Sequence, residues 1–445
     1  MNILVLNGSP KGQYSITLHT CLYLRKKFPE QNFTVFDVGK NIRSVEKDFS
    51  EAKSLVENAD VLLFCYPVYT FLVPSQLHRF IELLKGLDLK GKIATQVSTS
   101  KHFYDTTAHA FIEENCSDMG LFYIDGLSAD MEDLLTEKGR KQAEDWFRLL
   151  LWKIGREDFR APVWFAAGGK LAACGKMPSA DKGEGRKAVV VADLGIEPDA
   201  RERLRSLIDG FRAVFPYECD VVDISEFPFK GGCMSCFHCA ASGRCIYTDR
   251  FDDFLRENIH KHDAIVYAFS IKDHSMGSRF KMYDDRQFCN GHRTVTMGTP
   301  FGYLVDGCLS AEQNLRTVIE ARAQVGGNYL AGIACTEGDP GRDLELLCGR
   351  ICFAFEHSYQ PPQNFYGVGG MRIFRDLIFK MRGLMRADHK FFKSHGQYDF
   401  PQKEWKTSML MYLVGWMMNS PKVRAKMGNK INEGMIQEYR KVVDL

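Results

Sequence analysis

The feature that most constrains the fold of this chain is a regular alternation of short, β-rich apolar runs with longer segments of helical periodicity. In the first third of the chain the apolar runs are 3–6, 33–36, 61–66, 93–97 and 121–124, and the helical segments are 15–28, 75–84, 106–119 and 137–153. Such alternation predicts parallel strands joined by helices that cover both faces of a sheet. Residues 1–154 are therefore predicted to form one doubly wound α/β domain.

The same rhythm starts again after residue 187, which predicts a second copy of the domain over 187–358. Its runs are 188–192, 199–214, 219–224, 264–269, 302–305 and 329–334. The segment from Ala59 matches the segment from His262 without gaps, so that Asp60 stands opposite Asp263 and Ser75 opposite Ser278. Buried strands followed by helices resemble one another by chance, but duplication is the better interpretation.

Two segments fall outside the copies. Residues 155–186 lack any period and are predicted to be a linker. Residues 359–445 are predicted to form a basic helical extension, because fifteen Lys and Arg stand against seven Asp and Glu from Met371 onward, a net +8. The extension is either a surface for an acidic partner or an anionic membrane, or an arm that packs against its own domain or a sister chain. We favour packing, which involves Leu410, Met411, Leu413, Val414, Trp416 and Met417.

Composition limits the classes of function. The 445 residues carry a net charge of +2, and aromatics do not interleave with basic residues in the extension, so nucleic acid is not an expected partner. The longest apolar stretch, 408–418, is too short for a transmembrane segment. The chain begins with a strand-like run and no signal peptide, and ten of its cysteines are scattered singly. We therefore expect a reducing, cytoplasmic location.

Four other cysteines stand within thirteen positions: Cys233, Cys236, Cys239 and Cys245. The spacing C-x2-C-x2-C-x5-C places three thiolates on one tight loop and the fourth beyond Gly243, which suits an iron–sulfur cubane of the 4Fe-4S type. Zinc sites usually combine two separated C-x2-C pairs, so zinc ranks below the cluster. An unmetallated loop is a further interpretation, and a disulfide knot ranks last.

A turn between the first strand and the first helix predicts a phosphate site. It reads Asn7-Gly8-Ser9-Pro10-Lys11-Gly12 and is followed by Ser15 and Thr17. Backbone N–H groups and the helix dipole at such a turn favour a dianionic phosphate. The turn lacks the Gly-Lys-Ser/Thr end of a nucleotide P-loop and the pattern G-x-G-x-x-G, so a monophosphate fits best. An ordinary turn capped by Ser15 is the alternative.

Two more loops should meet this turn at the carboxyl edge of the sheet. The loop after the third strand runs from Pro67 to Pro74 and carries Tyr69 and Phe71, against which a planar heterocycle could lie. The loop after the fourth strand, 98–104, supplies hydroxyls, a cation and aromatics. Each loop alone is weak evidence, but three loops at one edge reinforce one another.

These residues carry a family resemblance. The pattern GSP-x4-S-x-T and the run YPVYTFLVPSQLHRFIELL resemble the NADPH-dependent FMN reductases of the flavodoxin-like superfamily, and the cysteine run is similar to that of the iron–sulfur flavoproteins. The resemblance implies two fused flavodoxin-like domains and FMN in the first. The residues it assigns to FMN are Ser9, Pro10, Lys11, Ser15, Thr17, Pro67, Val68, Tyr69, Thr70, Phe71, Ser98, Thr99, Ser100, Lys101 and His102. Ile16 stands where many relatives carry Asn.

The second copy lacks the flavin signals, because Asp193 and Glu197 in its first turn would repel a phosphate. We therefore expect one FMN in the first domain and one cluster in the second, in an oxidoreductase or electron-transfer protein. NAD(P)H or a ferredoxin-like protein would be the donor, and a small molecule or quinone the acceptor. No catalytic side chain is assigned, and a homodimer is conceivable. The alternative is a non-catalytic scaffold with a structural zinc site made by the four clustered cysteines.

Overall fold

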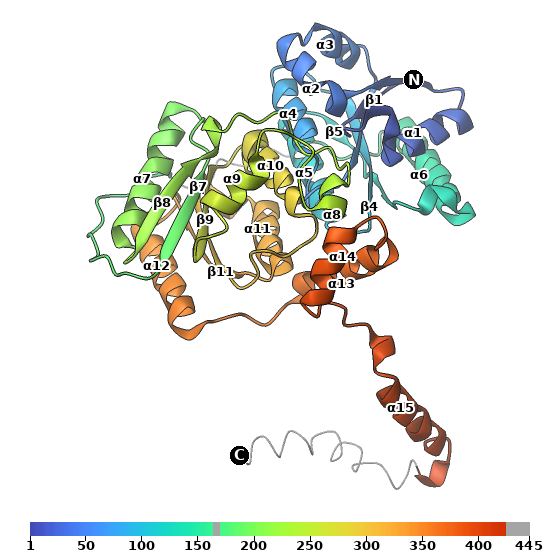
Figure 1. Ribbon diagram of the computed structural model, residues 1–445. Coiled ribbons are helices and arrows are strands. Elements are labelled where there is room, and N and C mark those ends of the chain that lie inside the picture. Colours follow the sequence, from blue (N-terminus) through green and yellow to red (C-terminus); the bar gives the residue numbers. More distant parts are fainter. Residues whose placement is uncertain (163–169, 424–445) are drawn as a thin grey trace. The chain divides into compact units, whose positions relative to one another are not determined.

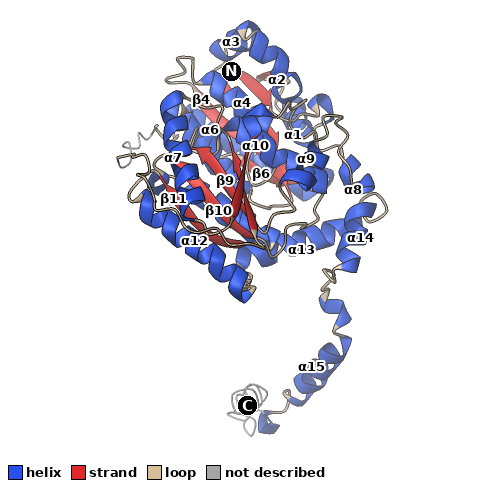
Figure 2. Cartoon of the chain, turned by 60° about the vertical axis from the view of Figure 1, so that its left-hand side comes forward, coloured by secondary structure: helices blue, strands red, loops and turns tan. Residues whose placement is uncertain are grey.

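Two parallel α/β domains make up most of the molecule (Figure 1). The computed structural model describes residues 1–162 and 170–423. In the first sheet the strand order is β2-β1-β3-β4-β5, with β6 also paired to β4, and in the second it is β11-β10-β9-β7-β8. Every ladder in both sheets is parallel. Helices cover the sheets in Figure 2, which confirms the predicted class of two flavodoxin-like domains with a helical extension.

The first domain follows the predicted rhythm closely. Its strands are β1 (Asn2–Asn7), β2 (Asn32–Phe36), β3 (Val61–Pro67), β4 (Ile93–Ser100), β5 (Phe122–Tyr123) and β6 (Leu127–Asp130). Its helices are α1 (Ile16–Lys27), α2 (Val38–Lys47), α3 (Ser50–Glu57), α4 (Ser75–Leu84), α5 (Asp105–Asp118) and α6 (Glu137–Gly155). Strands β1 and β3 are apolar and almost fully buried, as central strands of a parallel sheet should be.

The second domain repeats this order. Its strands are β7 (Lys187–Ala192), β8 (Glu218–Asp223), β9 (Ala264–Ser270), β10 (Pro300–Asp306) and β11 (Tyr329–Cys335). Its helices are α7 (Pro198–Val214), α8 (His238–Ser242), α9 (Phe251–Asn258), α10 (Gly277–Arg286), α11 (Gln313–Gly326) and α12 (Pro340–His357). The apolar core is continuous between the domains, because buried side chains of both belong to one cluster.

Equivalent residues of the two domains form equivalent hydrogen bonds. Asp60 accepts a hydrogen bond from the first N–H of β1 at 2.7 Å, and Asp263 accepts one from the first N–H of β7 at 2.9 Å. Helices α4 and α10 pack against each other across the domain boundary. Asp285 of α10 accepts from the Ser75 N–H at 2.9 Å, and Glu82 of α4 accepts from the Ser278 N–H at 3.0 Å. This reciprocal capping is what a fused pseudo-dimer of duplicated domains requires.

Strand β4 differs from its prediction. Ser98, Thr99 and Ser100 were expected in a loop, but they form the end of the strand and pair with β6. The pairing of Val97 to Ser100 with 127–130 satisfies the backbone groups of this polar stretch, which periodicity alone would not place in a sheet. Helices α2 and α3 were also not predicted from the sequence.

The predicted linker packs on the second domain from residue 170 onward. Ala172 N–H donates to the Thr336 carbonyl at 2.9 Å, and Cys174 N–H donates to Ser206 Oγ at 2.8 Å. Cys174 and Met177 also contact the apolar cluster beneath α7 and α12. Residues 163–169 of the predicted linker lie outside the described chain.

Three further helices follow the second domain: α13 (Phe365–Lys380), α14 (Arg386–Ser394) and α15 (Trp405–Met417). The chain divides into two compact units, Met1–Lys390 and Phe391–Leu445, and the second is described only to residue 423. The six side chains predicted to pack, from Leu410 to Met417, are exposed or nearly so. Packing of these side chains against a domain or a sister chain stays a prediction. No described helix is long and apolar enough to cross a membrane.

Candidate functional site

The side chain of Asn7 fixes the conformation of the turn after β1 through hydrogen bonds. Its amide donates to the Gly12 carbonyl at 3.1 Å and to Asp37 at 2.7 Å. Gly12 has φ +53°, in the left-handed region that favours glycine. A Cβ on Gly39 would lie 2.3 Å from the Gly8 carbonyl oxygen, so only glycine there lets α2 lie against the turn.

Helix α1 points its N-terminus into this turn. Ser15 caps the helix by accepting from the Leu18 N–H at 3.3 Å. In the described chain the N–H groups of Ile16 and Thr17 have no acceptor. Free N–H groups and the positive end of a helix dipole form a ready anion site. This geometry supports the predicted phosphate position.

The loop after β3 forms a two-residue turn. Tyr69 and Leu72 exchange backbone hydrogen bonds of 2.8 and 3.0 Å around Thr70 and Phe71, which have φ of 44° and 70°. Non-glycine residues enter this region at a cost of about 1–2 kcal/mol each. The second domain has the same turn, with Asp273 and His274 at φ of 56° and 59°. The two domains thus share even this strained turn, which supports their origin by duplication.

The second domain holds this turn of the first domain in place. Lys281 of α10 donates to the Tyr69 carbonyl at 2.9 Å and is ion-paired with Asp285, and both side chains are fully buried. Thr70 Oγ1 donates to Asp285 at 2.7 Å. The bonds offset the strain of the turn and place the rings of Tyr69 and Phe71.

A hydroxyl of strand β4 contacts the start of α1, next to the predicted phosphate turn. Thr17 Oγ1 and Thr99 Oγ1 lie 2.6 Å apart. Lys101 donates to Asp130 at 2.8 Å, and Ser100 Oγ accepts from the N–H of His102. His102 turns away from the cavity described below, and its imidazole Nδ1 lies 2.9 Å from Asp105.

Ser98 also faces away from that cavity, and its hydroxyl lies 2.8 Å from His109 Nε2. Burial lowers the pKa of His109 to about 4. The pKa of His109 is thus lower in the folded protein than in the unfolded chain. Its contribution to the free energy of unfolding is therefore fully present above about pH 6.5 and is lost as the pH falls toward 4.

We predict that His109→Gln reduces the acid sensitivity of the fold. The wild type should lose about 3 kcal/mol more unfolding free energy between pH 7 and pH 4 than the variant, from about 1.36 kcal/mol per pKa unit. Urea unfolding of both proteins at several pH values measures the difference. Equal losses would show that His109 does not titrate upon unfolding in this range.

The cysteine loop lies between β8 and α9. Ser235 and Phe237 have φ of 49° and 60°, and Cys239 lies in the short helix α8. Burial raises the pKa of the Cys233 thiol to about 12 and that of Cys239 to about 11. Cys239 Sγ donates to the Phe288 carbonyl at 2.8 Å. None of the four thiols of this loop forms a disulfide, so all four are available as ligands.

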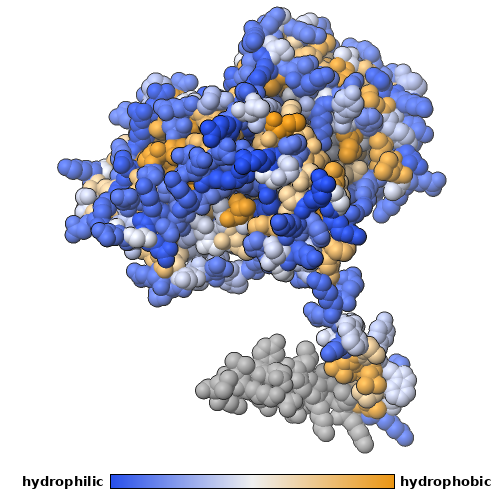
Figure 3. Space-filling model, in the orientation of Figure 1, coloured by the Kyte–Doolittle hydropathy of each residue, from blue (hydrophilic) through white to orange (hydrophobic). Residues whose placement is uncertain are grey.

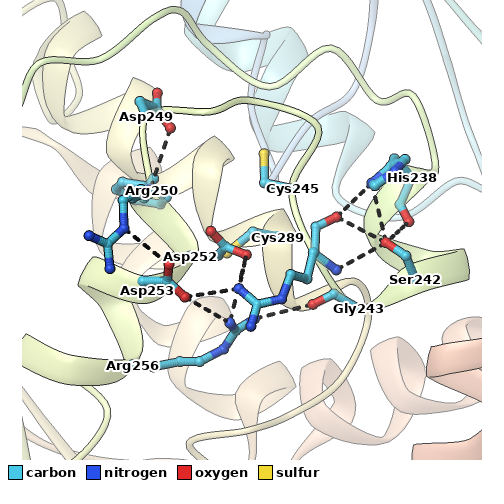
Figure 4. Close-up of polar contacts among 12 residues, drawn as sticks. His238, Ser242, Gly243, Cys245, Asp249, Arg250, Asp252, Asp253, Arg256 and Cys289 are labelled. Atoms are coloured by element: carbon cyan, nitrogen blue, oxygen red, sulfur yellow. Dashed lines mark hydrogen bonds and ion pairs between the residues drawn. The ribbon is translucent and has the colours of Figure 1, made fainter.

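The segment between Cys239 and Cys245 is fixed by arginines (Figure 4). Arg244 pairs with Asp253 at 2.9 Å, and Arg256 donates to the Gly243 carbonyl at 3.1 Å. Ser242 Oγ donates to the His238 carbonyl at 2.8 Å. The loop is thus anchored to α9 at its far end. Cys289, labelled in the same figure, is buried nearby.

Arg286 stabilises the cysteine loop through buried contacts. It is almost fully buried, donates to the Gly231 carbonyl at 2.8 Å and makes a bidentate pair with Asp249. Its guanidinium lies 4.4 Å from the centroid of the Tyr247 ring and 3.9 Å from Cys245 Sγ. A paired arginine can be buried, and its charge favours nearby thiolates.

One contact joins the phosphate turn to the cysteine loop. Lys11 Nζ lies 5.4 Å from the centroid of the Phe237 ring, which stands between Cys236 and Cys239. Burial lowers the pKa of Lys11, although the thiols of Cys236 and Cys233 oppose this effect. A cation of the first domain thus lies beside the predicted cluster ligands of the second.

Both domains line one cavity of about 360 Å³. The predicted residues on its wall are Ser9, Lys11, Ser15, Thr17, Pro67, Val68, Tyr69, Thr70, Phe71, Thr99, Ser100, Lys101, Cys233, Cys236, Cys239 and Cys245. Pro10, Ser98 and His102 are the predicted residues that do not line it. The structure therefore brings together the three loops and all four cysteines.

The rest of the wall was not predicted. It includes the segment 287–296, Asp284, Arg322, Tyr267 and Phe301, and Ile373, Phe374 and Leu377 of α13. The gapless match between the two domains could have indicated part of this wall, because it places Asp284 and Arg286 opposite Ile81 and Leu83. Charges opposite apolar residues on a buried helix indicate a role special to one copy.

Among the described residues, two other groups of side chains could ligate a metal. They are His78, Glu82 and Asp273, and Glu114, His274 and Glu312. Lys85 pairs with Asp273 at 2.8 Å, and His274 lies 3.1 Å from both Asp118 and Glu312. The charges are compensated within the protein, so neither group needs an ion.

Comparison with known proteins gives three kinds of match. The model of the family described as NADPH-dependent FMN reductase matches residues 1–111. An iron-sulfur flavoprotein of Archaeoglobus fulgidus is 27% identical over 189 residues, which covers 40% of this chain and 85% of that protein. Among solved structures, an NADH:FMN oxidoreductase without its ligand is 20% identical, with 33% of this chain and 88% of that chain covered and a TM-score of 0.29.

General stress protein 14 of Treponema denticola, solved in complex with FMN, is 15% identical, with 34% of this chain and 97% of that chain covered and a TM-score of 0.28. The family match covers the phosphate turn and the loops after β3 and β4. Over residues 1–111 the first domain is similar to the NADPH-dependent FMN reductase family, and an iron–sulfur flavoprotein is among the relatives of the chain.

Proposed function

We propose that this chain is a flavin-dependent oxidoreductase that passes electrons between one FMN in the first domain and one 4Fe-4S cluster on the cysteine loop of the second. The observation that carries the proposal is the shared cavity, whose wall includes Ser9 and Lys11 of the phosphate turn, residues 67–71 of the ring loop (Pro67 to Pro74) and all four cysteines. Two redox groups on one wall need no further carrier between them.

The residues present fit FMN. The free N–H groups of Ile16 and Thr17 and the ammonium of Lys11 would hold the phosphate, and Val68, Tyr69 and other apolar residues of the ring loop would lie against the flavin. The Tyr69 hydroxyl is buried and lacks a hydrogen-bond partner in the described chain, so a polar ring atom would satisfy it. Bound FMN supplies hydride and single-electron chemistry, while the protein supplies position and excludes water.

The cysteine loop fits a cluster better than a mononuclear zinc ion. Zinc held by thiolates at about 2.3 Å places their sulfurs about 3.8 Å apart. Among the described residues no three cysteine sulfurs all lie within 4.8 Å of one another. The ligands of a cubane bind different irons and stand further apart. The alternative of a non-catalytic scaffold with a four-cysteine zinc site is therefore not favoured, and the family match adds to the case against it.

We propose a single flavin per chain, because the second domain fills its own equivalent turn. Arg279 donates to Asp193 at 2.9 Å and to the Gly195 carbonyl at 2.7 Å. Arg203 makes a bidentate pair with Asp306 at the end of β10. Side chains that neutralise each other in this way leave no cationic cradle for a phosphate.

The acceptor would enter the part of the cavity that neither cofactor site uses. Its wall includes the rings of Tyr267, Phe301 and Phe374, which suit a planar apolar molecule such as a quinone. Asp284 is ion-paired with Arg322 there, and its Oδ2 is buried without a partner in the described chain. That oxygen would accept a hydrogen bond from a hydroxyl of the reduced product.

Filling this part of the cavity should block the acceptor and spare the cofactors. We predict that Ile373→Trp raises the KM for a soluble benzoquinone about tenfold or more, since the added ring occupies its space. Phe379→Trp, on the same helix but outside the cavity, is the matched control. Steady-state kinetics measure the effect. An unchanged KM with normal flavin and iron content would place the acceptor elsewhere.

The donor is NAD(P)H or a ferredoxin-like protein, and we place the protein in the cytoplasm, where the thiols of the cysteine loop stay reduced. Anaerobic addition of NADPH to the purified protein tests the function as a whole. Loss of flavin absorbance followed by bleaching of the broad iron–sulfur shoulder supports the proposed transfer. A protein that carries both groups but bleaches with neither NADPH nor reduced ferredoxin would contradict it.

A further inference from the structure

From Met409 to its end, helix α15 is apolar around its whole circumference. It reads WKTSMLMYLVGWM, and hydrophobic side chains are not confined to one face. Tyr412 is 82% exposed, Trp416 72% and Met409 62%, and Leu410, Met411 and Leu413 are each more than half exposed. Figure 3 shows the apolar surface of this segment. A cluster of this size is not left in water without a function.

The distribution of the apolar residues indicates what covers the helix. A second copy of the chain, or any helix that packs alongside, would cover one stripe and select an amphipathic pattern. A helix that is apolar on every side suits surroundings that reach it from several sides, such as lipid. Trp405 and Trp416 lie near its two ends, where aromatic residues favour the boundary between lipid and water.

The charges around the helix suit anionic headgroups. Lys406 lies at its start and Lys422 just beyond its end. From 405 to 432 the sequence has five Lys and Arg and no Asp or Glu. Clusters of basic residues next to an apolar helix attract anionic lipids. Thirteen residues span only about 20 Å, less than the ~30 Å hydrocarbon core, so the helix cannot cross it.

We propose that α15 docks this chain on the surface of an anionic phospholipid bilayer, with the helix embedded in one leaflet and the flanking cations on the headgroups. The docking is independent of the flavin and the cluster. It would bring the enzyme to the layer into which apolar acceptors partition.

Sedimentation of the full chain with vesicles tests the proposal. Vesicles of phosphatidylcholine and phosphatidylglycerol should pellet the wild type, and vesicles of phosphatidylcholine alone should pellet about tenfold less. Lys406→Glu/Lys422→Glu should weaken binding to the anionic vesicles by about tenfold, while Leu410→Ser/Leu413→Ser should weaken binding to both. Phe365→Ser, at an exposed phenylalanine on α13, should bind as the wild type does.

Two results would overturn the proposal. One is a wild type that pellets no more with anionic vesicles than without vesicles. The other is a concentration-dependent dimer, seen by light scattering, that Leu410→Ser/Leu413→Ser dissociates while vesicle binding is unaffected. The second result would show that another copy of the chain covers α15.

Discussion

We expect Cys236→Ser to remove the broad iron–sulfur absorption of the proposed cluster and most of the iron, while FMN stays bound at its normal stoichiometry. Serine is a poor ligand for iron, so a cubane held by the three remaining thiolates of the loop is labile. The flavin should be retained, because the turn after β1 that we propose for its phosphate lies in the other domain. Cys236 is itself exposed, so its loss opens no cavity in the core.

A matched control separates ligation from general damage. Cys352→Ser alters a half-buried cysteine on α12, which does not line the cavity, and should leave iron, sulfide and flavin unchanged. Iron analysis and visible spectra of the two anaerobically purified variants and the wild type measure these effects. Normal iron in Cys236→Ser would mean that the loop does not hold the metal, and loss of flavin together with iron would mean that the two sites are not separable.

We expect the replacement of both Ser9 and Thr17 by aspartate to expel FMN. Two carboxylates then face the phosphate at the N-terminus of α1, and each like charge about 4 Å away costs ~4 kcal/mol at an intermediate dielectric. The affinity for FMN should fall by about 100-fold or more, since about 1.4 kcal/mol is a factor of ten. The cluster should remain, because its ligands lie in the second domain. Flavin release and iron content measured on the same sample test both statements.

Both positions are buried, so the retained iron–sulfur spectrum also serves as the check that the variant is folded. Lys11→Glu, at a half-buried position on the same turn, should act in the same direction with a smaller effect. Ser50→Asp/Ser54→Asp adds the same charge on the exposed face of α3 and should change nothing. Full flavin content in the folded double variant would show that the phosphate is bound elsewhere.

Much of the fold could be predicted because local signals and global structure agree. Apolar runs such as 61–66 and 264–269 are central strands buried on both faces, and their length and composition leave few alternatives. The gapless match of Asp60 to Asp263 and of Ser75 to Ser278 reflects shared hydrogen bonds, which a periodic pattern cannot report. The turn after β1 could be proposed as a phosphate site from the sequence because its chemistry is local.

The parts that sequence reasoning missed depend on contacts between distant segments. Lys281 and Asp285 support the Thr70 turn from the other domain, and nothing near them in sequence indicates this. Ser98 and His102 belong to the predicted loop, but the pairing of β4 with β6 and the bond to Asp105 turn them from the cavity.

One FMN in the first domain and one iron–sulfur cluster in the second are the basis of every functional proposal made for this chain. The most direct test is to measure iron, acid-labile sulfide, zinc and extractable FMN in the same anaerobically purified sample. We expect one FMN per chain, iron and sulfide in equal amounts at about four each, as a cubane requires, and no stoichiometric zinc. Stoichiometric zinc without sulfide, or a protein that yields no FMN, would contradict this assignment.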